Sequence, residues 1–181
     1  LNFNDSGLSL LEISHRSKGF VAVMDEARAI VKRLMNLGDD YEVLYLQGGA
    51  SLQFLMVPFN LLSADGKAAY TNTGTWASGA IKEAKMIGNV DVVATSKEAN
   101  YSYIPKEFKV GSEYDYFHCT SNNTIFGTQM KSFPKVDTLL VCDMSSDIFS
   151  RELDFSQFDL IYAGAQKNMG PAGATLVVVK K

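Results

Sequence analysis

Short uninterrupted apolar runs are the feature of this sequence that most constrains its fold. The segments 139–142 and 176–179 contain only apolar residues. Because successive side chains of a strand point to opposite faces, such a run predicts a strand that is covered on both sides. Strands of this kind are typical of parallel or mixed sheets enclosed between layers of helices. The predicted strands are 41–46, 68–71, 90–94, 114–119, 124–130, 138–142, 160–163 and 176–179.

Helical periodicity is concentrated in the first half of the chain. Between positions 20 and 37, apolar residues recur every three or four positions, and Gly38 is the expected C-cap. The residues of this apolar stripe are Met24, Ala27, Val31 and Leu34. A second predicted helix is capped by Ser51 and is kinked or ended by Pro58. A third covers 77–87 and stops at the glycine that follows.

This mixture of elements predicts an α/β fold. We expect a three-layer α/β/α sandwich around a mainly parallel mixed sheet, formed as one domain over residues 1–181. With 181 residues, of which 46% are hydrophobic, the chain can bury a substantial core. The last predicted strand ends two residues before the C-terminus, and the chain begins with Leu1 rather than Met. These two features lead us to expect a truncated domain.

Net charge and cysteine content argue against several classes of function. The formal net charge of −3 gives no support for a nucleic-acid or anionic-membrane partner. No apolar stretch approaches the roughly 20 residues of a membrane span. The two cysteines, Cys119 and Cys142, form neither a CxxC pair nor a Cys/His ligand cluster for a metal. We therefore expect a reduced, cytoplasmic protein without a metal site.

A glycine turn follows the first predicted strand. It reads Gln47-Gly48-Gly49-Ala50-Ser51 and leads into a predicted helix. Free backbone amides at a helix N-terminus, together with the helix dipole, form an anion site, and small residues let a phosphate come close. The glycine patterns of dinucleotide-binding and Walker-type loops are both missing. The turn is therefore either a phosphate site or a plain strand-to-helix connection.

Two ionisable residues lie at the ends of predicted strands. Asp143 comes directly after 139–142, and ligands of α/β proteins bind outside the carboxyl ends of such strands. Its carboxylate could pair with a cationic ring nitrogen, although the Ser-Ser-Asp that follows is equally typical of a helix cap or loop. Lys167 lies in a loop rich in glycine and alanine between two apolar strands. A lysine partly shielded from water there can form a Schiff base, and the alternative is an ordinary exposed loop lysine.

Trp76 and Arg16 are further candidates. Trp76, the single tryptophan, follows a glycine turn and could stack on a planar ring or simply belong to the core. Arg16 could clamp a carboxylate or phosphate through two hydrogen bonds, or be an ordinary surface arginine. His118, inside a predicted strand, is interpreted as structural. Together these candidates are the parts of a pyridoxal-phosphate site. Such a site needs a phosphate-binding turn, an aromatic residue that stacks on the ring, a carboxylate for the ring nitrogen and a reactive lysine.

Four segments carry a resemblance to a known family. They are Glu12-Ile13-Ser14-His15-Arg16, the run 48–54, the run 79–84 and the run 161–173. These segments resemble the phosphoserine aminotransferases, which belong to the fold-type I, aspartate aminotransferase-like class of pyridoxal-phosphate enzymes. The resemblance covers nearly the whole chain, and its most specific segment is 161–173, which contains Gln166-Lys167-Asn168.

The resemblance implies a role for each residue that would contact the cofactor ring. Lys167 would hold pyridoxal phosphate as a Schiff base and later move a proton. Asp143 would pair with the pyridinium nitrogen, and Trp76 would stack on the ring. Thr124 would lie near the ring hydroxyl.

It also implies contacts to the phosphate and to the substrate. Ala50 and Ser51 would offer backbone amides to the cofactor phosphate, with Gln166 beside it. Arg16 would bind the anionic end of the substrate. The implied reaction is reversible amino transfer between L-glutamate and 3-phosphohydroxypyruvate, which gives 2-oxoglutarate and O-phospho-L-serine. This reaction belongs to serine biosynthesis, and in bacteria a related step serves pyridoxine biosynthesis.

The chain departs from the family in its length. Family members are about twice as long, have a smaller C-terminal domain, and form homodimers in which the partner supplies further phosphate contacts. The C-terminal domain is absent here, so we expect weak or no transaminase activity from these 181 residues alone. Two alternatives stay open: a related fold-type I aminotransferase or cysteine desulfurase, and a non-catalytic α/β domain that binds a phosphate ligand without using Lys167.

Overall fold

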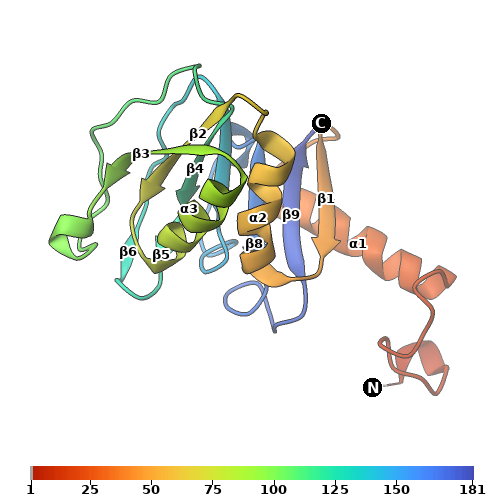
Figure 1. The fold of residues 1–181 in the computed structure, drawn as a ribbon. Helices are drawn as coiled ribbons and strands as arrows, with labels where there is room; N and C mark the ends of the chain where they lie inside the picture. Colours follow the sequence, from red (N-terminus) through yellow and green to blue (C-terminus); the bar gives the residue numbers. More distant parts are fainter. Residues whose placement is uncertain (1) are drawn as a thin grey trace.

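The computed structural model describes residues 2–181 as a seven-stranded sheet with helices on both faces (Figure 1). Leu1, the first residue of the expected domain, lies outside the described residues. The helices are α1 (Lys18–Met35), α2 (Gly49–Leu61) and α3 (Thr75–Ile87). Single 3-10 turns occur at Phe3–Asp5, Lys97–Ala99 and Phe155–Gln157. The strands of the large sheet are β1 (Tyr41–Leu46), β2 (Lys67–Asn72), β3 (Asn89–Thr95), β4 (Tyr116–Thr120), β7 (Leu139–Asp143), β8 (Leu160–Gly164) and β9 (Thr175–Lys180).

The order of strands in this sheet is β1-β9-β8-β7-β4-β2-β3. β9 runs antiparallel to both of its neighbours, and the other ladders of the sheet are parallel. The predicted mainly parallel mixed sheet is therefore confirmed. The carboxyl ends of β1, β2, β4, β7 and β8 consequently meet at one edge, where the amino end of β9 also lies.

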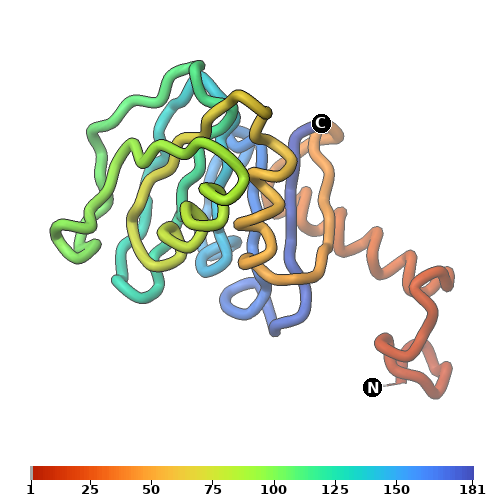
Figure 2. Tube along the Cα trace, viewed as in Figure 1, coloured from red at the N-terminus to blue at the C-terminus, as the bar shows by residue number. Residues whose placement is uncertain are grey.

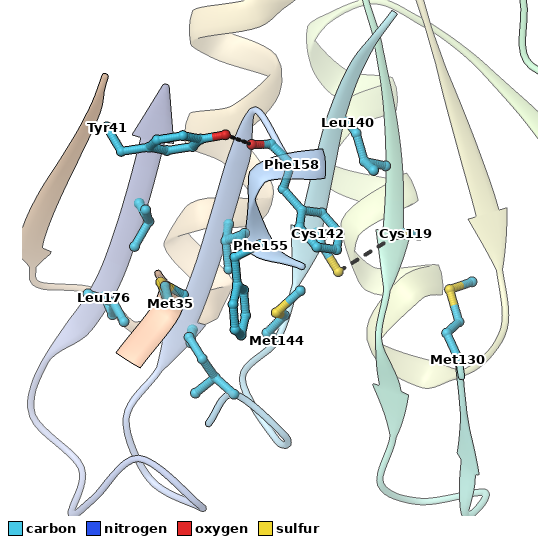
Figure 3. Close-up of a cluster of buried hydrophobic side chains, with 14 of the residues drawn as sticks. Met35, Tyr41, Cys119, Met130, Leu140, Cys142, Met144, Phe155, Phe158 and Leu176 are labelled. Carbon is cyan, nitrogen blue, oxygen red and sulfur yellow. Dashed lines mark hydrogen bonds between the residues drawn. The ribbon is translucent and has the colours of Figure 1, made fainter. Parts of the chain in front are cut away.

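Two hydrophobic clusters cover the two faces of the sheet, as the apolar runs predicted. Along β7, Leu140 and Cys142 belong to the cluster on the α1 side, whereas Val141 belongs to the cluster under α2 and α3. Figure 3 shows the first cluster, in which the sulfurs of Cys119 and Cys142 lie 3.7 Å apart on neighbouring strands. On that face α1 covers only part of the sheet, and residues from loops, such as Met144 and Phe158, complete the layer.

Details of α1 differ from the prediction. The helix begins at Lys18 after the N-cap Ser17, and it ends at Met35, because Asn36 adopts a left-handed conformation with a φ of 51°. Asparagine tolerates that conformation better than most residues, so Asn36 ends the helix and the prediction of Gly38 was wrong. The buried stripe at this end consists of Val31 and Met35, whereas the side chain of Leu34 is 56% exposed.

The start and end of α2 also differ from the prediction. The N-cap is Gly48, which has a φ of 92°, so Ser51 lies inside the first turn instead of capping it. A Cβ on Gly48 would lie 2.7 Å from the Cβ of Leu52, which is why a glycine is needed here. Pro58 does not end the helix, which continues to Leu61. Val57 packs in the cluster under α2 and α3, and Pro58 is also buried, which offsets the backbone hydrogen bond that proline cannot make.

The predicted strand 124–130 is instead a small hairpin. Its strands are β5 (Asn122–Asn123) and β6 (Thr128–Gln129), and they pair only with each other. Gly127, with a φ of 70°, allows the chain to reverse between them. Thr124 therefore lies at the start of a turn and not within a strand.

The N-terminal residues extend away from the rest of the molecule. Figure 2 shows that the trace before α1 runs away from the sheet, at the end of α1 far from β1. In the part of the chain that the structure describes, no helix is both long and apolar enough to cross a membrane.

Candidate active site

A cavity of about 420 Å³ opens at the edge of the sheet where the parallel strands end. This volume lies within the range of roughly 300–1,000 Å³ that is typical of small-molecule sites. Of the eight residues to which the sequence and the resemblance assign a site role, six line this cavity, together with Gly48 and Gly49 of the glycine turn. The six are Ala50, Ser51, Trp76, Asp143, Gln166 and Lys167.

One wall of the cavity is the N-terminus of α2. The first backbone hydrogen bond into this helix runs from the amide of Leu52 to the carbonyl of Gly48, at 3.3 Å. The amides of Gly49, Ala50 and Ser51 precede it and have no partner within the helix. Because these donors and the positive end of the helix dipole face a cavity, the wall can hold a phosphate or another anion.

Asp143 lies at the floor of the cavity, at the end of β7, and is only 4% exposed. Its Oδ1 accepts hydrogen bonds from the amide of Ser145 at 2.9 Å and from the hydroxyl of Ser145 at 2.6 Å. Burial raises the pKa of the Asp143 carboxyl, while the two Ser145 hydrogen bonds and the charge of Lys167 oppose that rise. Among residues 2–181 nothing donates to Oδ2, so this oxygen can accept a proton-bearing group of a ligand.

Lys167 lies in the loop between β8 and β9, across the cavity mouth. Its Nζ donates a hydrogen bond to Oγ1 of Thr124 at 2.7 Å and lies 5.9 Å from the centroid of the Trp76 ring. The hairpin, the N-terminus of α3 and this loop therefore meet around one amine. The sequence left open a lysine partly shielded from water and an exposed loop lysine. In the structure Lys167 is exposed, at the open side of the cavity.

Trp76 lies in the first turn of α3 and is 41% exposed, so it is not a core tryptophan. An indole that lines a cavity and is partly exposed is available to stack on a flat ligand. Gln166 is also exposed at the cavity mouth.

Two candidates do not line the cavity: Thr124, which contacts only Lys167 there, and Arg16. Of these two, Arg16 is the one without a hydrogen bond or ion pair to a cavity residue within residues 2–181. It lies in the exposed segment before α1, where its backbone amide contacts the hydroxyl of Ser14. Its contact with a substrate stays a prediction. His118, on β4, does not line the cavity; it is 1% exposed and its Nε2 lies 2.8 Å from the Tyr162 hydroxyl.

Several residues at the cavity were not singled out in the sequence. Ser145 links Asp143 to β8, because its hydroxyl oxygen also accepts a hydrogen bond from the amide of Gly164 at 3.1 Å. Ser146 contacts Asn122 of the hairpin through two hydrogen bonds. The signal in the sequence was the pair of serines after Asp143, which we interpreted only as a cap or loop.

Comparisons with known proteins agree on one family. A family model described as aminotransferase class-V matches residues 3–181. The phosphoserine aminotransferase of Flavobacterium psychrophilum is 71% identical over 182 residues, which cover 100% of this chain and 51% of that protein. The phosphoserine aminotransferase of Parabacteroides distasonis is 63% identical, over 99% of this chain and 50% of that protein. The chain thus spans about half the length of the curated relatives that it matches.

Solved structures give the same picture. A structure described as radiation damage of the Schiff base in phosphoserine aminotransferase has a TM-score of 0.97 and 48% identity, and it covers 100% of this chain and 52% of that one. A phosphoserine aminotransferase from Bacillus circulans has a TM-score of 0.95 and 47% identity, over 99% of this chain and 51% of that one. An aspartate aminotransferase from Thermus thermophilus, at 20% identity and a TM-score of 0.74, shares the fold.

Proposed function

Because the chain belongs to the class-V aminotransferase family, we propose that it is the cofactor-binding domain of a phosphoserine aminotransferase. The reaction would transfer an amino group from L-glutamate to 3-phosphohydroxypyruvate with the aid of pyridoxal phosphate. The observation that carries this proposal is the meeting of Lys167, the buried Asp143 and the N-terminus of α2 in one cavity. Identity of 71% along the whole chain supports the substrate assignment.

The residues present fit pyridoxal phosphate. The cofactor needs a cradle for its phosphate, an acid beside its ring nitrogen, a surface for its ring and an amine for its aldehyde. The cavity offers the amides of α2, the free Oδ2 of Asp143, the indole of Trp76 and the Nζ of Lys167. All four lie on different elements whose ends meet at the same edge of the sheet.

The proposed mechanism assigns one task to each of these groups. When bound, pyridoxal phosphate supplies an electron-withdrawing ring that stabilises negative charge at the α-carbon of an amino acid. Asp143, when ionised, keeps a proton on the ring nitrogen, which strengthens that effect. Trp76 fixes the plane of the ring. Lys167 is an amine at the open side of the cavity, so it can anchor the cofactor and move a proton at the substrate α-carbon.

The site bears on two alternatives. Within residues 2–181, neither Cys119 nor Cys142 could serve as the reactive cysteine of a desulfurase, because both are completely buried in the core. Burial raises the pKa of the Cys142 thiol, which suppresses the nucleophilic thiolate. A non-catalytic phosphate-binding domain would not need a lysine facing a buried carboxylate across the same cavity.

The length of the relatives indicates which part of the enzyme this chain forms and which contacts the rest of the protein would add. Since the chain corresponds to about half of each curated relative, we propose that residues 1–181 form the large, cofactor-binding domain of a longer protein. In the longer protein, homodimer formation and the substrate contact of Arg16 would complete the site.

Trapping of the cofactor tests the proposal directly. Pyridoxal phosphate is added, borohydride is used to fix it to the amine with which it has condensed, and the labelled peptide is mapped by mass spectrometry. We expect label on Lys167, its loss in Lys167→Ala, and its retention in the control Lys109→Ala, which removes an exposed lysine remote from the cavity. Label scattered over surface lysines, or no label, would overturn the cofactor site. An assay with glutamate and 3-phosphohydroxypyruvate, in the longest form of the protein, tests the substrates.

A further inference from the structure

Asp143 and Ser145 form a hydrogen-bonded unit that recurs elsewhere in the chain. In both copies an aspartate Oδ1 accepts the amide and the hydroxyl of the serine two residues later. At Asp154 the corresponding distances to Ser156 are 3.0 Å and 2.5 Å. The Asp154 copy lies on the surface beside the 3-10 turn Phe155–Gln157, whereas Asp143 is buried under the cavity. The Asp-x-Ser sequence therefore forms these hydrogen bonds in both environments. Only the buried copy can affect the cavity.

A third contact distinguishes the Ser145 copy. The oxygen of Ser145 accepts the amide of Gly164, the last residue of β8, so this oxygen is fixed between two strands. Because the oxygen is held by Gly164, the hydroxyl hydrogen is directed at Oδ1 of Asp143. Oδ1 is then fully used, and Oδ2 is the oxygen left for the cavity. Gly164 also begins the loop that carries Lys167, so one serine connects the acid to the lysine segment.

We propose that Ser145 is a positioning residue that stabilises the Asp143 carboxylate through two hydrogen bonds to Oδ1 and leaves Oδ2 free to meet the ring nitrogen of the cofactor. This inference rests on the proposed function, since it concerns the same site.

The charge balance around Asp143 explains why it depends on Ser145. Burial favours the neutral carboxyl, and Asp147, which follows on the same segment, also favours it. The hydrogen bonds from the side chain and the amide of Ser145 are the largest effects that lower the pKa of Asp143. The charge of Lys167, in the loop after β8, lowers this pKa further. The other titratable neighbours are Tyr162 on β8 and Cys142 on β7, and burial raises the pKa of both, so they stay neutral. Without the Ser145 hydroxyl, a larger fraction of Asp143 is neutral. A neutral carboxyl cannot form an ion pair with a protonated ring nitrogen.

Four variants separate this role from a merely structural one. Ser145→Ala removes the hydroxyl, and Ser145→Cys replaces it by a weak donor of similar size, in case the alanine variant folds poorly. Ser145→Thr restores a hydroxyl. The matched control is Ser156→Ala, which removes the same hydrogen bond from the exposed Asp154.

The first measurement needs no cofactor. Carbon-13 NMR of the aspartate carboxyls in the cofactor-free protein follows the titration of Asp143. We expect a higher pKa of Asp143 in Ser145→Ala and Ser145→Cys than in the parent, a value near that of the parent in Ser145→Thr, and no effect of Ser156→Ala on Asp143. An unchanged pKa in the two hydroxyl-free variants overturns the inference, whatever the cofactor does.

The second measurement compares the affinity for pyridoxal phosphate with that for its 1-deaza analogue, which lacks the ring nitrogen. We expect the preference for pyridoxal phosphate to fall about tenfold in Ser145→Ala, because a hydrogen bond to a charged group is lost, and to recover in Ser145→Thr. A general loosening of the cavity would weaken both ligands equally and would contradict the positioning role. Failure of the parent to bind pyridoxal phosphate would instead sink the proposed function, while the NMR measurement would still decide the effect of Ser145 on Asp143.

Discussion

Gly164 lies so close to Ala50 that a Cβ on Gly164 would sit 3.0 Å from the Ala50 backbone nitrogen. The end of β8 therefore packs directly on the first turn of α2, and the two elements that would hold the lysine and the phosphate share one contact. A side chain at position 164 would displace part of this pair, because neither side of the contact is a flexible side chain.

Gly164→Ala should therefore weaken phosphate binding at α2. We expect the affinity for pyridoxal phosphate to fall about tenfold, since overpacking costs about 1–3 kcal/mol, and the affinity for pyridoxal, which lacks the phosphate, to fall less. Equilibrium titration with both ligands measures the difference. Gly170→Ala is the matched control, because a Cβ there meets nothing within 4 Å. Equal losses for both ligands would mean that the helix N-terminus is not the phosphate site.

Trp76→Ala should separate cofactor binding from folding. Because Trp76 is 41% exposed and belongs to neither buried hydrophobic cluster, we expect the cofactor-free protein to keep most of its thermal stability. Loss of ring stacking should weaken pyridoxal phosphate by up to about tenfold, given about 0.5–1.5 kcal/mol for an aromatic pair. Trp76→Phe should retain part of the affinity. Phe59→Ala, at a residue that is 73% exposed on α2, serves as the control. An equal affinity loss there would count against stacking.

Asp143→Asn should stabilise the cofactor-free protein at neutral pH. Burial raises the pKa of Asp143 in the folded state above its unfolded value, so ionisation favours the unfolded state. The stability contributed by this carboxyl is fully present below the unfolded pKa and is lost as pH rises through the folded pKa. Asparagine cannot ionise, so its advantage should appear above the folded pKa and vanish in acid.

Thermal unfolding across pH measures this effect, with about 2–4 °C expected for each 1 kcal/mol in a protein of this size. Asp154→Asn, at the exposed copy of the same turn, should show no such gain. In the longest form of the protein, Asp143→Asn should lower transaminase activity at least about 100-fold, because a charge that stabilises the reacting ring is removed. A variant less stable than the parent at neutral pH would refute the assigned cost of burial.

The sequence was most informative where the position of a residue along a strand decided its place. Asp143 directly follows a run that is apolar on both faces, so its location at the carboxyl edge of the sheet followed from the direction of the strand alone. The same reasoning applies to Ala50, Ser51 and Lys167, which follow other strands that end at the same edge. In a mainly parallel sheet, residues at these positions are expected to lie close together.

The sequence was least informative where a turn decided the outcome. Thr124 reaches Lys167 because the chain reverses at Gly127, whereas apolar and β-branched residues around it suggested a continuous strand. The role of Ser145 depends on Gly164, which is 19 residues away, and no local pattern reports such a contact. Exposure of Lys167 depends on which elements surround the cavity mouth, which is likewise a matter of tertiary packing.

Tyr41 offers a test of the fold that should leave the site unchanged. Its hydroxyl, on the edge strand β1, lies 3.0 Å from the carbonyl oxygens of both Ser156 and Phe158, and the ring is 2% exposed (Figure 3). We expect Tyr41→Phe to lower the free energy of unfolding in urea by about 1–2 kcal/mol, because the Phe158 carbonyl is left buried without this donor. Tyr103→Phe, at a residue that is 44% exposed, should cost much less. If Tyr41→Phe also weakened pyridoxal phosphate, the core and the cavity would be coupled, contrary to the separation of Tyr41 from the cavity-lining residues.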